Sequence, residues 1–381
     1  MNALVIGSGM MGSALAHDLS RSGGVERVIL ADINLERARE VAGRMGKNLE
    51  PVQLDTRSPD QVVETMKRVS VAVGATSYGH NVGLTEAAIR AGIHFCDLGG
   101  NMDVVYRQMA LDKEAKAAGV CIIPNCGLAP GLACVIAAGG AARFSSVDEI
   151  HIRVGGLPLH PRPPLNYQLV FSPEGLINEY IEPAEVLRDG QLKSVDSMLD
   201  LEELEFPAPF GKLEAFNTSG GISTLTRMFA GKAKHLDYKT IRYTGHCEKF
   251  RLLLDLGFAS SEPIMAGPNF RTAREMFEEM LRRRLPSNGP DVVLTRVTIK
   301  GSMGKERKAL AYEMVDYYDE KEKMTSMMRT TAFPTSIIAQ MAAGGTITAR
   351  GVQPPEQCVP LEPFLKELRA RNIVIAESLS S

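Results

Sequence analysis

The feature that most constrains the fold is a glycine motif close to the start of the chain. An apolar run leads into Gly7, Gly9 and Gly12, which have the spacing G-x-G-x-x-G, and a helical pattern follows at once. In this motif the first glycine permits a tight turn, the second lets the backbone approach a pyrophosphate, and the third lets the helix pack on the sheet. The phosphates would lie at the helix N-terminus, beside Met10 and Met11. The motif predicts a dinucleotide site, and the alternative is a glycine-rich turn without a ligand.

An acidic residue follows at the spacing expected for ribose recognition. A second apolar run, 25–31, ends at Asp32, which lies 20 residues after Gly12. A carboxylate here holds the adenosine ribose and repels a 2′-phosphate, so it favours NAD over NADP. Arg37 and Arg39 follow closely, but on a helix after Asp32 we expect them to face solvent. We therefore expect NAD as the cofactor.

Strand and helix patterns alternate over the first 125 residues. The six short apolar runs are 4–6, 25–31, 51–55, 71–73, 93–97 and 120–124. This alternation predicts the α/β class, with a Rossmann-type doubly wound parallel sheet whose ligand crevice lies at the carboxyl ends of the strands. Gly74 and Ala75 fall at such an end and are expected beside the cofactor. Asp55 would contact the adenine or cap a turn. Asp97 would lie near the nicotinamide half, or would form a turn before two glycines.

The pattern changes after about residue 130. Apolar and polar residues alternate in 150–154, 293–299 and 310–314, which is the period of half-exposed antiparallel strands. A long, proline-rich and irregular region separates the first of these segments from the other two. We therefore expect three parts: a dinucleotide-binding domain over 1–130, an α+β substrate and dimerisation domain with a largely antiparallel sheet over 131–329, and C-terminal helices over 330–381 that return to the first domain.

Composition excludes several classes of protein. With 43 basic and 45 acidic residues the formal charge is -2, which gives no indication of nucleic-acid or anionic-membrane binding. The six cysteines form no C-x-x-C pair, which indicates reduced thiols without structural zinc, so we expect no metal site. The first residues lack the pattern of a secretory signal, and the apolar stretch 128–144 indicates a buried helix. A cytoplasmic protein is expected.

Several segments of the second half carry a resemblance to a known family. They are 154–158 (VGGLP) with 163–167 (PPLNY), 171–180 (FSPEGLINEY), 213–216 (LEAF) with 219–221 (SGG), and 240–246 (TIRYTGH). With these motifs the chain resembles the saccharopine dehydrogenase superfamily, and within it the lysine 6-dehydrogenases, nearly end to end. The resemblance implies NAD-dependent oxidative deamination of L-lysine at the ε-carbon. The products would be ammonia, NADH and 2-amino-6-oxohexanoate, which cyclises to piperideine-6-carboxylate. The resemblance also implies a homo-oligomer built on a dimer.

Amine oxidation requires a proton acceptor, because the ammonium must lose its proton before the hydride leaves. With a lysine pKa of about 10.4, the neutral amine at neutral pH costs on the order of 4 kcal/mol. An acceptor beside the ammonium offsets this cost, and the candidates are Asp97, His246 and Tyr167. Each has an ordinary structural alternative: a turn former, a satisfied loop histidine and a packed tyrosine.

The carboxylate of an amino-acid substrate favours an arginine, whose planar fork donates two parallel hydrogen bonds. We predict Arg242 for this role, with Arg227 and Arg329 as alternatives. Glu174 or Glu214 would pair with the α-ammonium, unless they cap helices or face solvent.

Two other functions remain open from the sequence. A saccharopine or carboxyalkyl-amine dehydrogenase performs reductive condensation of an aldehyde with an amino acid on the same scaffold. Its substrates carry additional carboxylates and would need more than one converging arginine. The chain could instead be a non-catalytic NAD-binding sensor, if the predicted catalytic residues do not converge.

Overall fold

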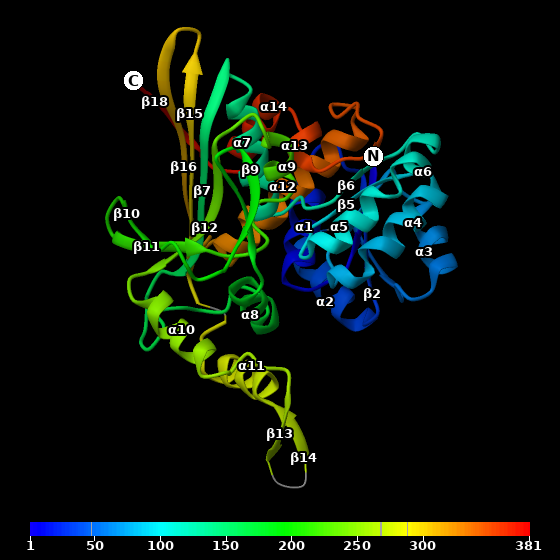
Figure 1. Cartoon of the computed structure of the whole chain (residues 1–381). Coiled ribbons are helices and arrows are strands. Elements are labelled where there is room, and N and C mark those ends of the chain that lie inside the picture. The colour runs from blue at the N-terminus through cyan, green and yellow to red at the C-terminus, as the bar shows by residue number, and fades with distance from the viewer. Residues whose placement is uncertain (47, 267–268, 288) are drawn as a thin grey trace. The chain divides into compact units, whose positions relative to one another are not determined.

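The structure, a computed structural model, describes residues 1–46, 48–266, 269–287 and 289–381 of the 381-residue chain. The chain divides into two compact units, whose elements are labelled in Figure 1. The first unit consists of Met1–Ala142, Ser223–Leu225 and Met328–Val374, and the second of Arg143–Ile222, Thr226–Met327 and Ile375–Ser381. No helix of the described residues is long and apolar enough to span a bilayer.

The first unit is built on a seven-stranded sheet in the order β17-β6-β5-β4-β1-β2-β3. Its strands are β1 (Asn2–Ile6), β2 (Arg27–Asp32), β3 (Leu49–Gln53), β4 (Val71–Gly74), β5 (His94–Asp97), β6 (Cys121–Ile123) and β17 (Gly351–Val352). All the pairings described are parallel. Strands β1 and β4 in the middle of the sheet read as short apolar runs because they are buried. The order 3-2-1-4-5-6 is that of dinucleotide-binding sheets, so the predicted α/β class is confirmed.

Helices connect these strands. They are α1 (Met10–Arg21), α2 (Leu35–Met45), α3 (Pro59–Met66), α4 (Asn81–Ala91), α5 (Met102–Met109), α6 (Asp112–Ala117), α7 (Ala133–Ala141), α13 (Pro355–Cys358) and α14 (Leu361–Ala370). The first unit continues to Ala142, beyond the predicted boundary at 130. The reason is that α7 packs on the C-terminal helices: a Cβ added at Gly139 would lie 2.6 Å from that of Leu361.

The segment Met328–Val374 belongs to the first unit. Helix α12 (Ser326–Ala343) begins in the second unit and continues in the first. Thr335 donates a hydrogen bond to the Cys126 carbonyl oxygen at 2.7 Å, and Ser336 donates to Asp18 of α1 at 2.6 Å. Further along, β17 pairs with β6 and so extends the parallel sheet by one strand.

The second unit is built on a nine-stranded, mostly antiparallel sheet in the order β10-β11-β12-β7-β15-β16-β18, with β8 beside β12 and β9 beside β8. The strands are β7 (Ser146–Pro158), β8 (Ala184–Arg188), β9 (Gln191–Val195), β10 (Glu202–Phe206), β11 (Gly211–Asn217), β12 (His235–Tyr243), β15 (Asp291–Met303), β16 (Glu306–Tyr317) and β18 (Ala376–Ser380). The three predicted alternating segments lie within β7, β15 and β16. The pairing of β12 with β7 is parallel.

Helices of the second unit share one apolar core. They are α8 (Pro173–Ile181), α10 (His246–Asp255) and α11 (Ala273–Arg284), and α9 (Leu225–Phe229) starts at the unit boundary. The rings of Phe250 on α10 and Phe277 on α11 have centroids 5.6 Å apart in this core. A separate two-stranded ribbon, β13 (Pro263–Ala266) and β14 (Asn269–Thr272), extends from the start of α11 (Figure 1).

Candidate functional site

The turn between β1 and α1 has the conformation that the glycine motif predicts. Gly7 has a φ of +105°, and a Cβ there would lie 2.5 Å from the carbonyl oxygen of Ala75. A Cβ at Gly12 would lie 1.9 Å from the Gly7 carbonyl oxygen. At Gly9 the nearest described atom would be Nη2 of Arg37, at 3.7 Å. The first and third positions therefore require glycine, while the second leaves room for a phosphate at the N-terminus of α1.

A cavity of about 340 Å³ opens at the carboxyl ends of β2 and β3. It is lined by Ile6, Gly7, Ala31, Asp32, Ile33, Leu54, Asp55, Thr56, Arg57, Thr76 and His80. Oγ1 of Thr76 is buried and has no hydrogen-bond partner within the described chain, so it can bond to a ligand. The cavity's position beside the glycine turn fits the adenosine half of a dinucleotide.

Asp32 is held in place by the turn itself. One carboxylate oxygen accepts from both the amide and the hydroxyl of Ser8 at 2.7 Å, and the other accepts from the Asn34 amide at 2.9 Å. Burial raises the pKa of Asp32, but these hydrogen bonds and the charge of Arg37 hold it below its usual value. The side chain is therefore a carboxylate at neutral pH, as ribose recognition requires.

Asp55 follows β3 and Gly74 ends β4, two strands that are consecutive in the chain but separated by β1 and β2 in the sheet. Asp55 lines the cavity and pairs with Arg57 at 2.8 Å, and the hydrogen bonds from Arg57 lower the pKa of Asp55 to about 2. At Gly74 an added Cβ would lie 3.0 Å from the Phe95 ring, so glycine keeps β4 close to β5. Arg57 thus brings a cation to a cavity in which the sequence predicted carboxylates alone.

Asp97 is fully buried at the end of β5. One oxygen accepts from the amides of Gly99 at 2.7 Å and Asn125 at 3.2 Å, and the other from the Gln108 side chain at 2.7 Å. Burial raises its pKa, although the three hydrogen bonds oppose this. The carboxylate joins the segments that follow β5 and β6, and a role for Asp97 as proton acceptor stays a prediction.

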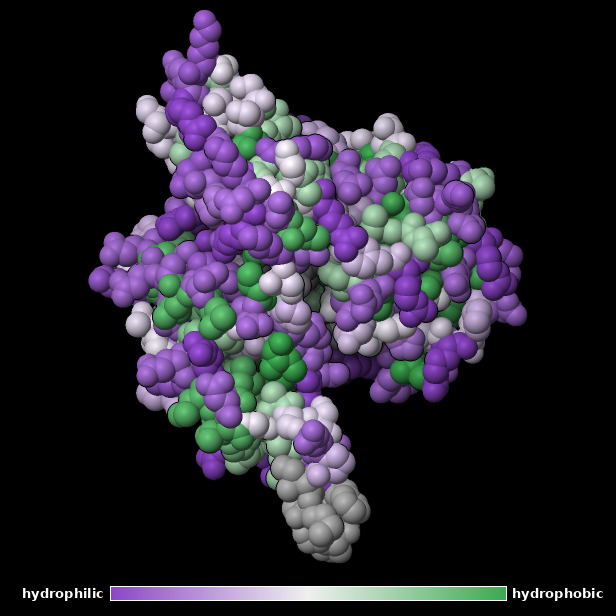
Figure 2. All heavy atoms as spheres, viewed as in Figure 1, coloured by the Kyte–Doolittle hydropathy of each residue, from purple (hydrophilic) through white to green (hydrophobic). Residues whose placement is uncertain are grey.

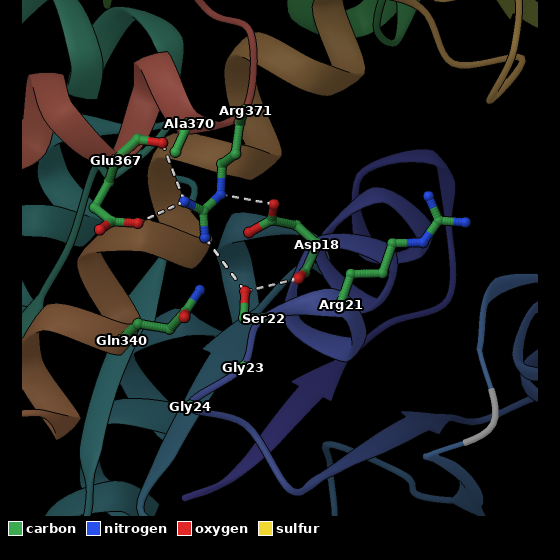
Figure 3. A pocket seen from close by; sticks show the side chains of 9 residues that line it. All are labelled: Asp18, Arg21, Ser22, Gly23, Gly24, Gln340, Glu367, Ala370 and Arg371. Carbon is green, nitrogen blue, oxygen red and sulfur yellow. Dashed lines mark hydrogen bonds and ion pairs between the residues drawn. The ribbon is translucent and has the colours of Figure 1, made fainter.

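Another cavity of the first unit, of about 480 Å³, lies between α1 and the C-terminal helices (Figure 3). Arg371 donates to Asp18 at 2.7 Å, to Glu367 at 2.8 Å and to Ser22 at 3.3 Å. Because the guanidinium is already neutralised by these carboxylates, this cavity is a structural junction and not a candidate catalytic site.

A buried hydrogen-bond chain lies in the second unit. Nε of Arg242 on β12 donates to the hydroxyl of Tyr180 on α8 at 2.8 Å, and this hydroxyl lies 3.1 Å from Nε2 of His246 on α10. Nδ1 of His246 lies 2.9 Å from the Leu165 carbonyl oxygen. Since a carbonyl can only accept, Nδ1 carries the proton and Nε2 accepts from Tyr180. These hydrogen bonds fix the position of the Arg242 guanidinium.

Arg242 is a buried cation without a paired anion. It is 3% exposed, and its guanidinium lies 4.8 Å from the centre of the Tyr167 ring. Within the described residues it makes hydrogen bonds to Tyr180 and to a backbone carbonyl and forms no ion pair, although the charge of nearby Glu179 acts on it. By contrast, the buried Arg153 and Lys239 of the same unit both pair with carboxylates. An unpaired buried charge is costly, so the geometry favours binding of an anionic group here.

Glu179, the residue before Tyr180 on α8, is a candidate that the sequence did not single out. Its side chain is partly exposed. Burial of the carboxyl group by the surrounding protein raises the pKa of Glu179 to about 7, although the positive charge of Arg242 opposes the shift. A carboxyl that titrates near neutral pH can both accept and return a proton. The one indication in the sequence was that Glu179 lies inside the family motif at 171–180.

The surroundings of the other predicted residues of this unit differ from one residue to the next. Burial lowers the pKa of His246 to about 3, and both ring nitrogens are bonded, so it is not the proton acceptor. Glu214 accepts from the amides of Gly245 at 2.8 Å and Cys247 at 2.6 Å, which caps α10. Glu174 is exposed in the first turn of α8. Burial raises the pKa of Tyr167 to about 12, so its phenol stays protonated at neutral pH.

The structure thus sorts the predicted residues into two groups. Tyr167, Arg242 and His246 meet in the second unit, with Glu214 beside Arg242 in the register of β11 and β12. The cofactor residues belong to the first unit, as does Asp97. Within the described chain, no group of three or more histidine, cysteine or acidic side chains is arranged to hold a metal ion.

Two family models match almost the whole chain. Residues 3–123 match the saccharopine dehydrogenase NADP binding domain, and residues 127–374 match the saccharopine dehydrogenase C-terminal domain. The chain belongs to the saccharopine dehydrogenase family. Members of this family are amino-acid dehydrogenases, and their first domain binds a nicotinamide dinucleotide. The predicted resemblance to this family is confirmed.

Individual relatives are distant in sequence. The mitochondrial alpha-aminoadipic semialdehyde synthase of Mus musculus is 21% identical over 97% of this chain and 47% of its own length. The saccharopine dehydrogenase [NADP(+), L-glutamate-forming] of Pyricularia oryzae is 23% identical over 68% of this chain and 58% of its own length. The chain thus spans about half the length of these relatives. The apo saccharopine dehydrogenase (L-Glu forming) of Saccharomyces cerevisiae has the same fold, with a TM-score of 0.81, 19% identity and complete coverage of both chains.

These comparisons do not confirm the finer predictions. Placement of the chain among the lysine 6-dehydrogenases is not confirmed, because the relatives are named saccharopine dehydrogenase and alpha-aminoadipic semialdehyde synthase. NAD as the specific dinucleotide is not confirmed either, because the matched model is named for NADP.

Proposed function

We propose that this protein is a nicotinamide-dinucleotide-dependent dehydrogenase that acts on the carbon–nitrogen bond of saccharopine or a similar N-substituted amino acid. The names of the Pyricularia oryzae and Saccharomyces cerevisiae relatives support this substrate class. It therefore replaces lysine as the first candidate. The observation that carries the proposal is Arg242, a fixed and buried guanidinium that lacks an anionic partner among the described residues and suits a substrate carboxylate.

In this proposal the cofactor, when bound, accepts a hydride from the carbon next to nitrogen. Arg242 binds a substrate carboxylate, and Tyr180 with His246 holds the guanidinium in place. Glu179 accepts the proton of the substrate's ammonium group, because its pKa of about 7 leaves much of it ionised at neutral pH. After its proton has passed to solvent, the Glu179 carboxylate accepts a proton from the water that attacks the substrate's iminium carbon and donates it to the departing nitrogen, which releases the amino acid and the aldehyde.

A second candidate is oxidative deamination of lysine. In the described part of the second unit, the other buried Arg and Lys side chains, Arg153 and Lys239, are neutralised by carboxylates. A single unpaired arginine matches one carboxylate better than the several carboxylates of saccharopine. This observation keeps lysine as an alternative to be tested in the same assay.

A substrate screen tests the proposal. The purified protein is incubated with saccharopine, lysine, ornithine or glutamate and with NAD or NADP, and formation of the reduced cofactor is followed by absorbance. We expect kcat/KM for saccharopine to exceed that for lysine by on the order of tenfold or more, which corresponds to about 1.4 kcal/mol. A preference for lysine would overturn the first candidate in favour of the second. Cofactor binding without turnover of any of these substrates would indicate a sensor.

The choice of dinucleotide is a separate proposal. The names of the matched model and of the fungal relative support NADP. Asp32 supports NAD, because its carboxylate is ionised and would repel a 2′-phosphate. We propose NAD on this physical ground. A higher kcat/KM with NADP would contradict it and would indicate that Arg37 and Arg57 bind the phosphate.

A further inference from the structure

Two tyrosine rings lie against the Arg242 guanidinium, and their hydroxyls differ in their hydrogen bonds. The hydroxyl of Tyr180 is fully used, because it accepts from Nε of Arg242 at 2.8 Å and donates to Nε2 of His246 at 3.1 Å. The hydroxyl of Tyr167 is also buried, but it has no hydrogen-bond partner among the described residues. The nearby Val170 amide can only donate, so within the described chain the proton of Tyr167 lacks an acceptor.

The surroundings of the Tyr167 hydroxyl are apolar. Tyr167 and Tyr180 belong to the core that also contains Phe250 of α10 and Phe277 of α11. Figure 2 shows hydrophobic surface over these two helices as well. A polar group buried among such neighbours costs free energy unless it forms a hydrogen bond. A donor that is held there without an acceptor is therefore a candidate for binding a ligand.

The Arg242 guanidinium has a donor available beside this hydroxyl. Among the described residues its hydrogen bonds use Nε, to Tyr180, and Nη1, to the Ile241 carbonyl oxygen, which leaves Nη2. The guanidinium carbon lies 4.8 Å from the centre of the Tyr167 ring. Since a phenol oxygen is about 3 Å from its ring centre, the two groups are at most about 8 Å apart, which one carboxylate with a hydrogen bond of about 2.8 Å at each oxygen can span.

Glu179 lies near both donors but binds neither of them. Its negative charge acts on Tyr167 and on Arg242. In the described chain, however, it forms no ion pair with Arg242 and no hydrogen bond with Tyr167. The group that would satisfy both donors is therefore an added anion with two oxygen atoms.

We propose that Tyr167 is a substrate-binding residue, whose hydroxyl donates to one oxygen of a substrate carboxylate while Nη2 of Arg242 donates to the other. His246 is the positioning residue of this pair. Its ring bonds to Tyr180 through one nitrogen and to the Leu165 carbonyl oxygen through the other. Leu165 precedes Tyr167 by two residues, so one side chain holds both donors in place. The proposal rests on the proposed function for the identity of the substrate, but the contact itself requires only a carboxylate.

Calorimetric titration of the protein saturated with NADH or NADPH tests the contact without turnover, because a reduced cofactor cannot accept a hydride. The ligands are saccharopine, glutamate and lysine, together with lysinamide, in which a carboxamide replaces the carboxylate. We expect Tyr167→Phe to raise the Kd for saccharopine on the order of tenfold or more, since a hydrogen bond to a charged group is lost. The matched control is Tyr317→Phe, because Tyr317 is 43% exposed elsewhere in the same unit and should keep the wild-type Kd.

Thermal melts without the amino-acid ligand separate this role from a structural one. Tyr180→Phe removes two hydrogen bonds of the folded protein, so its midpoint of unfolding should fall below that of the wild type. Tyr167→Phe removes a hydroxyl that has no partner in the described chain, so its midpoint should equal or exceed the wild-type value. A midpoint as low as that of Tyr180→Phe would overturn the proposal, because the hydroxyl would then be paired inside the protein.

The titrations also distinguish failure of this contact from failure of the proposed substrate. Equal binding of saccharopine by the wild type and Tyr167→Phe would overturn the role of Tyr167 and leave the proposed substrate class standing. Binding of lysine but not saccharopine, weakened in Tyr167→Phe, would support the contact and contradict the proposed substrate. If no carboxylate ligand binds the wild type, or if lysinamide binds as tightly as lysine, the contact is excluded.

Discussion

At the scale of single residues, the most informative side chain is Arg242. A buried guanidinium normally pairs with a carboxylate, as Arg153 does with Asp237 in the same unit. The Arg242 guanidinium instead lies over the ring of Tyr167. Its side-chain hydrogen-bond partner in the described chain is the hydroxyl of Tyr180. The folded protein therefore holds a charge whose desolvation an anionic ligand would offset.

Replacing Arg242 by methionine should separate binding from stability. Loss of a charge-assisted contact in a buried pair costs about 2–5 kcal/mol, so KM for the amino-acid substrate should rise on the order of 100-fold or more, with KM for the cofactor unchanged. The midpoint of thermal unfolding should stay the same or rise, because the variant buries an apolar chain in place of an unpaired charge. Steady-state kinetics and a thermal melt measure both. An unchanged KM for the amino acid would remove Arg242 from the site.

Glu179 should control the acid limb of the pH profile. Its pKa of about 7 means that it is protonated below this pH and cannot accept the substrate's proton. For substrate oxidation, kcat should therefore fall as the pH drops through about 7. Glu179→Gln should lower kcat on the order of 100-fold and abolish this limb. Glu174→Gln, an exposed position on the same helix, serves as the control. A limb that persists in Glu179→Gln would assign it to another group.

The limits of prediction from sequence at this scale have a physical cause. Arg242 was predicted because the chemistry of a carboxylate demands an arginine and the family motif contains one; its burial fits this role, which stays a prediction. The role of His246 could not, because its tautomer depends on Leu165 and Tyr180, which are 81 and 66 residues away in the chain. Glu179 was missed for a similar reason, since its raised pKa results from packing and not from its neighbours in sequence.

At the scale of elements, the start of α12 depends on a single buried carboxyl. Asp291 at the start of β15 accepts from the amides of Ser326 at 2.6 Å and Met327 at 2.9 Å. Burial raises the pKa of Asp291 to about 6, and nearby Asp316 adds to the shift. The protonated form is therefore favoured in the folded state relative to the unfolded chain.

This shift predicts a pH-dependent stability. A raised folded-state pKa contributes stability below the unfolded value of 3.8, and the contribution is lost as the pH rises through about 6. About two pKa units correspond to about 3 kcal/mol. The free energy of unfolding of the wild type relative to Asp291→Asn should decrease by this amount between pH 3 and pH 7. Urea titrations at several pH values measure it, and parallel curves for the two proteins would contradict the prediction.

Strands in which apolar and polar residues alternate regularly could be predicted from the sequence, and other strands could not. The alternation within β7, β15 and β16 indicated their strands because each has one face in the core. Strand β9 is exposed along most of its length and so lacks an apolar period. The pairing of β12 with β7 is parallel inside a mostly antiparallel sheet, which local sequence cannot indicate.

At the scale of the molecule, an ion pair of Arg371 connects the C-terminal segment to the first helix of the chain. Its guanidinium pairs with Asp18 of α1, 353 residues away, and with Glu367 of α14 (Figure 3). Arg371→Met would leave the buried Asp18 without its cation, which costs about 3–5 kcal/mol. We expect a clearly lower midpoint of thermal unfolding. Arg369→Met, at an exposed position nearby, should leave the midpoint unchanged, and equal midpoints for both variants would refute the role of Arg371.

Neither unit is a continuous piece of chain, since the first includes Ser223–Leu225 from the middle and the second includes the last residues, Ile375–Ser381. A protease that cuts once within 226–327 would therefore leave both units divided between two fragments. Expression of residues 1–142 alone would yield a sheet without β17 and without the helices that pack on α7. Genetic dissection of this protein has to proceed by point substitution, because no single continuous segment contains the whole of one unit and nothing of the other.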